Sequence, residues 1–469
     1  MLSGRKAECE ARNHDLLRNA GVSGILGRHL EALDCTAKSR LPASRVFQQR
    51  TRPLLERENA PAIIVGADSM TARNPFAERG GAVRGVLDLA SGCYPAFLFG
   101  GSIGRMLPVF HFHDVTRDSF EPPLQYLAEN GYRTVMTDEI ARLVIDGISP
   151  GPRAIALTFD DAWRSVWTVA MPLLRRSGLR AILFAIPGRV SDAATVRPTI
   201  DDNAAAALSA VSSSPFATWP ELRAMHASGV FDIQSHTRTH AMIFSHDQIV
   251  DFVTPEYTQQ PLLNRPVAGV DGAATFVEPQ ALGTPLYAGR SRMSDARRFL
   301  PDPRTAERCR EHVTRNGGAA FFARSGWRRE LEALAETGRG AFEDDQARAT
   351  WIRDELVEGR ELLNGALGTT AVRHVALPWG VAGDITRQAL ELTGHATAFA
   401  QRPFERLGVR AGDDRYELTR LNGRFVTCLP GRGRKWLLTA PSVHDERSSG
   451  EDGVLRPGTD GEPRTTAVD

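Results

Sequence analysis

Cysteine is scarce in this sequence, and its few copies lie far apart. The chain of 469 residues has five cysteines, and no two of them form a Cys-x-x-Cys pair. This spacing excludes the common zinc ribbons and dithiol redox motifs. It leaves a reduced, cytoplasmic setting as the expectation.

An excess of charge of either sign is also absent. Lysine and arginine number 57 against 56 acidic residues, so the formal net charge is +1. A nearly neutral chain gives no electrostatic argument for binding to nucleic acid or to an anionic membrane surface. We therefore expect no nucleic-acid partner.

Long apolar runs are missing too. The first fifteen residues are polar and charged and lack the apolar stretch that a secretory signal needs. The apolar segment at 94–112 is broken by glycine, arginine and proline, so it falls short of a membrane-spanning helix. The sequence predicts neither a secretory leader nor a transmembrane segment, and it leaves the oligomeric state open.

From residue 106 onward, short β-type runs alternate with helical segments. Such alternation predicts an α/β fold with a parallel sheet. Helices are expected at 119–130 and 345–363. Strands are expected at 107–113, 133–136, 154–159, 181–186, 230–234, 372–377 and 396–400.

The regions around this core follow a different pattern. Residues 1–104 have no distinct pattern apart from an amphipathic helix expected at 16–33, and their role is unknown. The expected domain spans 105–430 and is interrupted at 246–371 by an insertion rich in Gly, Pro and Arg, which either shapes substrate specificity or only packs on the surface. The composition of 431–469 predicts a disordered tail.

Two strands are expected to end in residues that can bind a metal. Asp160 and Asp161 close the strand at 154–159, and His236 and His240 follow the strand at 230–234. A turn after the first strand would let one carboxylate bind a metal while the other faces substrate, and the histidine spacing places both imidazoles on one face of a helical turn. Taken singly, either pair is more often a helix cap or a chance spacing.

The joint pattern resembles the NodB-type polysaccharide deacetylases, carbohydrate esterase family four, over residues 107–425. That family's Thr-Phe-Asp-Asp motif stands at 158–161, its Ser-His-Thr/Ser-x-x-His motif at 235–240, and its Pro-Tyr-Gly-like turn at 378–380 as Pro-Trp-Gly. The segment Phe-His-Asp-Val at 112–115 is similar to the family's first strand.

The resemblance implies a distorted (β/α)₇-type barrel that hydrolyses an N-acetyl, or less often an O-acetyl, group on a carbohydrate. It assigns Asp160 as general base. It assigns Asp161, His236 and His240 as ligands of a divalent metal, most often Zn²⁺. Trp379 and Pro378 would contact the substrate, whereas Trp163 and Trp219 are more typical of core residues.

Two departures from the family pattern affect the base and the acid. Where many relatives have an arginine that orients the base, this chain has Ala376. Arg420 is a candidate replacement, with a surface arginine on a strand as the alternative. The usual acidic histidine is not evident, and His113 is a candidate acid, with a structural histidine at the barrel rim as the alternative.

Three functions remain open from the sequence. The first is a metal-dependent deacetylase acting on an N-acetylated amino sugar in a polysaccharide, oligosaccharide, glycolipid or glycosylated metabolite. The second is hydrolysis of a non-sugar amide on the same barrel. The third is a catalytically weak carbohydrate-binding remnant, which Ala376 and the unassigned acid would favour.

Overall fold

The computed structural model describes residues 93–209, 214–259, 261–268, 275–335, 340–401 and 406–435. The helix expected at 16–33 and all but the first five residues of the tail expected at 431–469 lie outside these ranges. Within the described residues, no helix is both long enough and apolar enough to cross a bilayer.

Strand β3 (Ala154–Asp161) shows how the sequence builds the sheet. All of its residues are buried, as expected for a parallel strand covered on both faces. Ala154 and Ala156 pack into one apolar cluster, whereas Ile155, Leu157 and Phe159 pack into another. This alternation, with period two, separates the inside of the barrel from its helix-covered outside.

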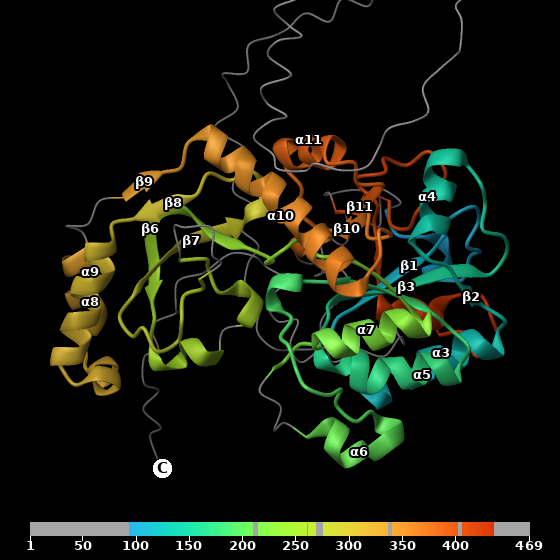
Figure 1. The fold of residues 1–469 in the computed structure, drawn as a ribbon, viewed down its shortest axis with the longest axis horizontal. Coiled ribbons are helices and arrows are strands. Elements are labelled where there is room, and N and C mark those ends of the chain that lie inside the picture. Colours follow the sequence, from blue (N-terminus) through green and yellow to red (C-terminus); the bar gives the residue numbers. More distant parts are fainter. Residues whose placement is uncertain are drawn as a thin grey trace, which may run out of the picture. The chain divides into compact units, whose positions relative to one another are not determined.

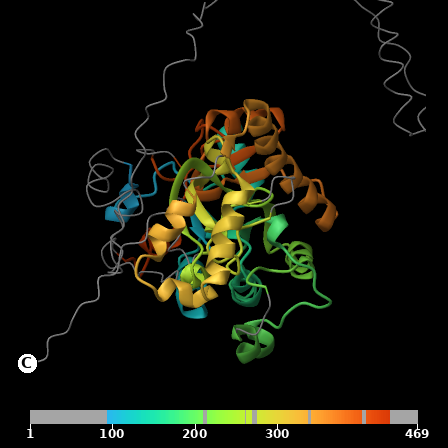
Figure 2. The same cartoon turned by 90° about the vertical axis from the view of Figure 1, so that its left-hand side faces the viewer.

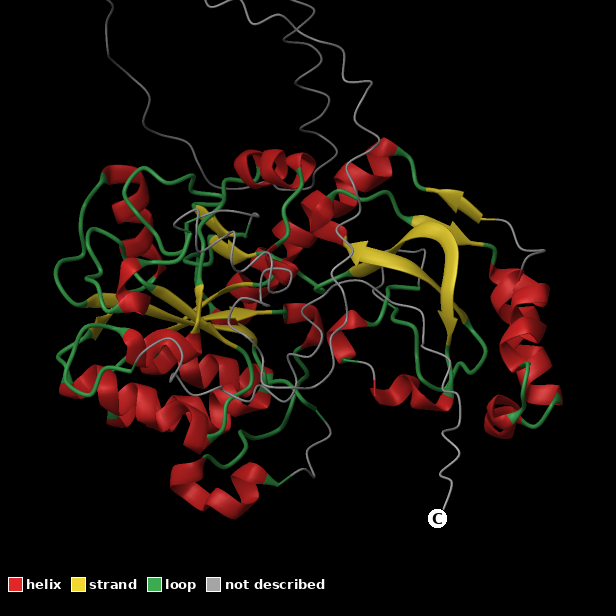
Figure 3. Cartoon of the chain, turned by 180° about the vertical axis from the view of Figure 1, so that it is seen from behind, coloured by secondary structure: helices red, strands yellow, loops and turns green. Residues whose placement is uncertain are grey.

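Seven parallel strands form a curled sheet in the order β11-β10-β5-β4-β3-β1-β12, and β2 (Arg133–Thr134) pairs with β3 outside this path. A parallel bridge between Phe399 and Leu418 joins β11 to the segment just before β12. The remaining strands of the path are β1 (Val109–Phe112), β4 (Ala181–Ala185), β5 (Phe231–Ser235), β10 (His374–Ala376), β11 (Thr397–Phe399) and β12 (Leu421–Asn422). The expected distorted (β/α)₇-type barrel is confirmed (Figure 3).

Helices cover the strands on the outside of the barrel (Figure 1). The first of them begins at a capping box, in which Thr116 and Ser119 each accept a hydrogen bond from the other's backbone N–H. The barrel helices are α3 (Arg117–Glu129), α4 (Thr137–Asp146), α5 (Met171–Arg176), α7 (Trp219–Ser228), α10 (Asp345–Leu367) and α11 (Asp384–Leu392), and α6 (Ile200–Leu208) lies in the connection between β4 and α7.

The region between β5 and α10 has secondary structure that the sequence pattern did not predict. Two antiparallel pairs form there, and α8 and α9 pack side by side against their own apolar cluster (Figure 2). The bounds are β6 (Met242–Phe252), β7 (Pro285–Ser291), β8 (Phe299–Pro301), β9 (Gly340–Phe342), α8 (Pro303–Arg315) and α9 (Trp327–Ala335). By contrast, α10 packs against β5, α7 and α11, so this end of the expected insertion is part of the barrel wall.

Candidate metal centre and its neighbouring carboxylate

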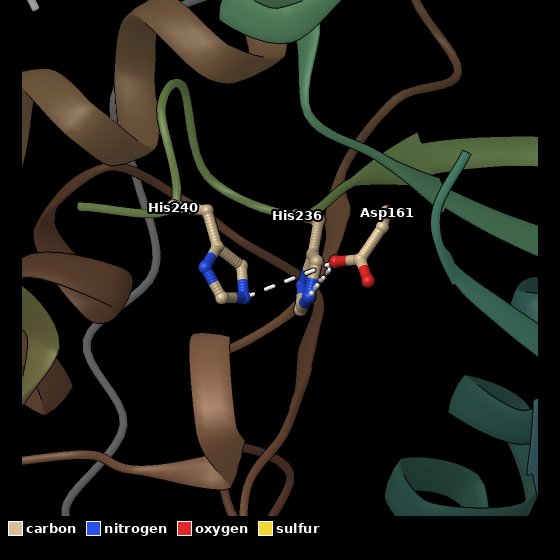
Figure 4. Close-up of side chains that lie close together, drawn as sticks. All are labelled: Asp161, His236 and His240. Atoms are coloured by element: carbon tan, nitrogen blue, oxygen red, sulfur yellow. Dashed lines mark ion pairs between the residues drawn. The ribbon is translucent and has the colours of Figure 1, made fainter. Parts of the chain in front are cut away.

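Three buried side chains from two barrel loops meet at the carboxyl ends of the strands. Asp161 is the last residue of β3, and His236 and His240 follow β5 (Figure 4). Oδ1 of Asp161 lies 3.4 Å from Nε2 of His236 and 3.9 Å from Nε2 of His240. One potential ligand atom from each residue lies within 4.8 Å of the others, so the group has the size of a metal site.

The backbone around this cluster adopts conformations that side chains usually avoid. Positive φ angles occur at Asp161, the last residue of β3, and at Ala162. They also occur at Thr237 and His240 after β5, and at Trp379 after β10. A non-glycine residue in this region is strained, so the surrounding structure must hold it there. At Asp161 the turn breaks the alternation of the strand, which frees its carboxylate from the direction that an extended strand would impose.

Each imidazole is fixed by a different neighbour. Nδ1 of His236 lies 2.8 Å from the carbonyl oxygen of Ala376, which can only accept, so Nδ1 is the donor in this contact and Nε2 faces Asp161. The ring of His240 lies 4.1 Å from that of Trp379, centroid to centroid. Burial, and then the neighbouring His236, lower the pKa of His240 to about 3, which keeps its ring neutral and able to bind a cation.

The carboxylate of Asp161 is also held from behind. Nε1 of Trp163 donates a hydrogen bond of 2.9 Å to Oδ2, whereas Oδ1 is buried and accepts no hydrogen bond. Burial raises the pKa of Asp161, but the contact with His236 and the other imidazoles lowers it below its usual value overall. A buried anionic oxygen that faces two imidazole nitrogens fits a divalent cation, because the cation would supply the missing positive partner.

The second carboxylate, Asp160, is held by an arginine that is 260 residues away in the sequence. Nη1 and Nη2 of Arg420 lie 2.7 Å from Oδ1 and Oδ2 of Asp160, a bidentate pair. The guanidinium also reaches Thr158 and lies over the rings of Phe184 and Phe399. The interpretation of Arg420 as a surface arginine was therefore wrong, since its side chain is only 12% exposed.

This pair also sets the charge of Asp160. Burial raises the pKa of the carboxyl group, but the attraction of Arg420, with help from His236 and His113, outweighs burial and lowers the pKa far below its usual value. Asp160 is therefore ionised throughout the neutral range. The pair fixes the orientation of the carboxylate at the expense of its basicity.

Two histidines lie beside Asp160: His111 within β1 and His113 directly after it. Nε2 of His113 is 3.9 Å from Oδ2 of Asp160, and the rings of His113 and His111 meet edge to face with centroids 5.7 Å apart. Burial, and then Arg420, lower the pKa of His111 to about 3. His111 was not predicted as a site residue, although alternation along a strand that ends near His113 points both side chains to the same face.

The aromatic residues have more structural contacts than the sequence suggested. Trp379 packs on His240, and Trp163 binds Asp161 and lies against Phe216. Pro378, before Trp379, is buried. These contacts show that two of the tryptophans orient metal-binding candidates.

The structure is a parallel barrel with a buried Asp-His-His cluster at the carboxyl ends of its strands, beside a second carboxylate that is bound by an arginine. Such a cluster has the ligand types of a metal site that keeps a position open. Residues 147–265 match the family model described as polysaccharide deacetylase. The matched stretch contains both carboxylates and both histidines of the site.

Curated relatives match only short stretches. Poly-β-1,6-N-acetyl-D-glucosamine N-deacetylase of Escherichia coli (strain K12) is 27% identical over 126 residues, which cover 27% of this chain and 18% of the relative. YxkH of Bacillus subtilis (strain 168), provisionally named a polysaccharide deacetylase, is 26% identical over 88 residues, 17% of this chain and 32% of the relative. The matches thus span less than a third of the length of each relative.

Solved structures give weak likenesses over longer stretches. A de-N-acetylase from Aggregatibacter actinomycetemcomitans has a TM-score of 0.41 at 15% identity, covering 67% of this chain and 94% of that one. The BpsB deacetylase domain of Bordetella bronchiseptica has a TM-score of 0.41 at 18% identity, covering 69% of this chain and 97% of that one.

Proposed function

We propose that this chain is a metal-dependent hydrolase that removes an N-acetyl group from an amino sugar in a polysaccharide, oligosaccharide, glycolipid or glycosylated metabolite. The observation that carries the proposal is that two adjacent carboxylates at the end of β3 have different partners. Asp161 faces two imidazoles, and the adjacent Asp160 is held by Arg420. Asp161 is thus placed to bind a cation, and Asp160 is placed to accept a proton.

Asp161, His236 and His240 would hold the divalent ion, which we take to be Zn²⁺ because carboxylate oxygen and imidazole nitrogen are its usual ligands in such sites. When bound, such an ion lowers the pKa of a water molecule and polarises an acetyl carbonyl group. The chain's own residues set where this chemistry takes place. His236 is oriented by the Ala376 carbonyl, His240 by Trp379, and Asp161 by Trp163.

Asp160 would accept the proton as water attacks the acetyl carbon, and Arg420 keeps both of its oxygens in place for that transfer. His113, beside Asp160, would donate a proton to the sugar nitrogen as the C–N bond breaks. The products are acetate and the free amino sugar. His113 is 21% exposed at its side chain, so a substrate can approach it.

The ion pair between Arg420 and Asp160 argues against a carbohydrate-binding remnant. Ala376 removes the orienting arginine from its usual position, but Arg420 supplies a bidentate partner from another strand end. A buried Asp160 without that partner would be costly, whereas a protein that only binds sugar needs neither group. The pair therefore supports a site that keeps a reactive carboxylate.

The name of the Escherichia coli relative suggests a substrate class for the test. That protein is a poly-β-1,6-N-acetyl-D-glucosamine N-deacetylase. We propose β-linked oligomers of N-acetylglucosamine as the first substrates to examine. O-acetylated sugars and acyclic N-acetyl amides serve as comparisons that separate the sugar deacetylase from an ester hydrolase and from a non-sugar amide hydrolase.

The experiment measures acetate release from this panel by the full chain loaded with zinc, together with the metal content of each sample. Asp160→Asn should lower kcat on N-acetyl sugars by about 100-fold to 10,000-fold while the metal stays bound. His236→Ala should lose the metal and the activity together. Arg117→Ala, at an exposed ion pair on α3, is the matched control and should change neither.

Each alternative gives a distinct result. Release from acyclic amides alone would replace the sugar deacetylase with a non-sugar amide hydrolase. Full metal occupancy with no release from any compound would support a binding role. Equal activity of Asp160→Asn and the unmodified protein would contradict the assignment of Asp160 as base.

A further inference from the structure

The loop that carries His236 and His240 is held by a helix that lies outside the matched deacetylase region. Residue Glu355 of α10 is 115 positions beyond His240 in the sequence, and its side chain is 2% exposed. Its Oε2 accepts a hydrogen bond of 2.9 Å from the backbone N–H of Thr239, and its Oε1 accepts one of 2.7 Å from the Thr239 hydroxyl. One carboxylate thus binds the residue immediately before a candidate ligand twice.

The main chain of α10 adds a third contact to the same loop. The carbonyl oxygen of Glu355 accepts a hydrogen bond of 2.9 Å from the N–H of Arg238. Nε1 of Trp351, one turn earlier on the helix, donates to Oε1 of Glu355 at 3.3 Å. Because a buried carboxylate needs several donors to offset its loss of water, these bonds account for its position in the wall of the barrel.

A glycine lets the helix come this close. A Cβ atom on Gly359 would lie 2.9 Å from the backbone nitrogen of Arg238 and 3.0 Å from Oγ of Ser235. These distances are shorter than Cβ contacts normally reach. Gly359 is one helical turn after Glu355, so the two residues face the same loop and act on it together.

The opposite side of the loop is held as well. The backbone N–H of Gly188, in the short helix η4 (Pro187–Arg189), donates a hydrogen bond of 2.8 Å to the carbonyl oxygen of Arg238. A Cβ on Gly188 would come 2.6 Å from that oxygen. The loop therefore passes between η4 and α10 and is bound to both.

This loop needs external support because it is strained. Thr237 and His240 both have positive φ, which costs free energy that local interactions must offset. No capping glycine is present between Ser235 and His240 to relieve it. The contacts with α10 fall on Arg238 and Thr239, between the two strained residues. They hold the main chain of the loop, and the main chain in turn sets the directions of both imidazoles.

We propose that Glu355 and Gly359 are positioning residues for the metal centre, which hold the Ser235–His240 loop so that His236 and His240 face Asp161. This inference rests on the proposed metal-dependent function. It gives the last helix of the interrupting region a supporting role at the metal centre, exerted through the loop. This role differs from the two expected for the region, which were substrate specificity and surface packing.

The test measures the Kd for Zn²⁺ by competition with a chromogenic chelator, together with the thermal unfolding of the metal-free full chain. Glu355→Ala should weaken zinc binding by about 10-fold to 100-fold, as is usual for lost outer-shell partners. Zinc affinity of Glu355→Gln should stay within about threefold of the unmodified protein. Its amide oxygen can accept from the Thr239 N–H and its amide NH₂ can donate to the Thr239 hydroxyl, so only the 3.3 Å bond from Trp351 is lost. Glu361→Ala, at an exposed position of α10, is the matched control.

A second variant guards against simple unfolding. Gly359→Ala raises the helix propensity of α10, yet its Cβ would push the helix away from the loop. We expect weaker zinc binding by about 10-fold without a lower helix content. Replacement of zinc by Co²⁺ adds a spectroscopic signature, since a displaced imidazole would change the visible absorption bands of the bound ion.

The possible outcomes separate this inference from the proposed function. If the unmodified protein binds zinc and both Glu355→Ala and Gly359→Ala bind it equally well, the positioning role is overturned and the metal centre stands. If the unmodified protein binds no divalent ion, the metal centre itself is overturned, and the positioning role with it. Weaker binding in these two variants, with Glu355→Gln and Glu361→Ala close to the unmodified protein, supports the inference.

Discussion

The two sides of the candidate site are built in different ways. The proposed metal side consists of Asp161, His236 and His240, which stand in two short motifs at or just after the ends of β3 and β5, where the backbone is strained. The base side consists of Asp160, Arg420 and His113, which come from three strand ends and meet only because the barrel curls. Local sequence specifies the first side, and barrel closure assembles the second.

Because of this difference, we expect some substitutions to change metal affinity and activity together, and others to change activity alone. A change on the metal side should alter metal affinity and activity together, because the ion is lost. A change on the base side should alter activity and leave the ion in place. The predictions below test that separation, from the largest expected effect to the smallest.

Removal of a ligand should have the largest effect. His240→Ala takes away one of the three proposed ligands, so zinc affinity should fall by more than about 100-fold, beyond the range for outer-shell changes. Acetate release should fall in parallel, and the loss should be partly reversed by excess zinc. His226→Ala on α7 is a control outside the cluster. Unchanged zinc binding in His240→Ala would remove this residue from the ligand set.

Loss of the arginine should affect the base alone. Arg420→Gln removes the bidentate partner of Asp160, and we expect kcat to fall by about 100-fold because the carboxylate is no longer held in place. Zinc affinity should stay within about threefold, well below the effect of losing an outer-shell partner of a ligand.

The same variant should shift the pH profile. Arg420 lowers the pKa of Asp160 against the effect of burial, so its removal raises that pKa. Asp160 in the variant then takes up a proton at a higher pH than in the unmodified protein, and the acidic limb of kcat/KM should move toward neutral pH. An acidic limb in the same position for both proteins would show that Asp160 is not the group that titrates.

The proposed acid can be tested through the leaving group. His113→Gln should lower kcat by about 100-fold on N-acetyl sugars, whose amine must gain a proton as it leaves. On 4-nitrophenyl acetate the loss should be much smaller, because nitrophenolate leaves without a proton. Equal losses on both substrates would give His113 an orienting role beside Asp160 in place of an acid role.

Loss of a hydrogen bond behind a ligand should have the smallest effect. Trp163→Phe keeps the ring contact with Phe216 but removes the donor to Oδ2 of Asp161. Zinc affinity should fall by about 10-fold, the lower end of the range for such partners. Trp167→Phe is the matched control, since Trp167 donates to the carbonyl of Arg197 instead. Equal zinc affinity in the two variants would contradict a role for Trp163 in orienting Asp161.

Much of the barrel could be predicted from the sequence. The strands expected at 154–159 and 181–186 are found as β3 and β4, and the helix expected at 345–363 is found within α10. These segments have strong patterns because buried parallel strands need continuous apolar runs. The antiparallel strand pairs of the interrupting region were not predicted, because β6 and β7 mix buried and exposed positions without a regular alternation. The two-residue strand β12 is too short to have a pattern.

The sequence by itself determined which reactive groups the site contains, namely two adjacent carboxylates and two histidines at the ends of buried strands. Residue identity and the period of a strand are local properties, so a motif contains them. Only the tertiary structure decided which groups support that chemistry. Arg420 meets Asp160 because the chain returns to the barrel at β12, and Glu355 meets Thr239 because α10 packs against the end of β5. These contacts join residues more than a hundred positions apart, and their geometry depends on the whole fold.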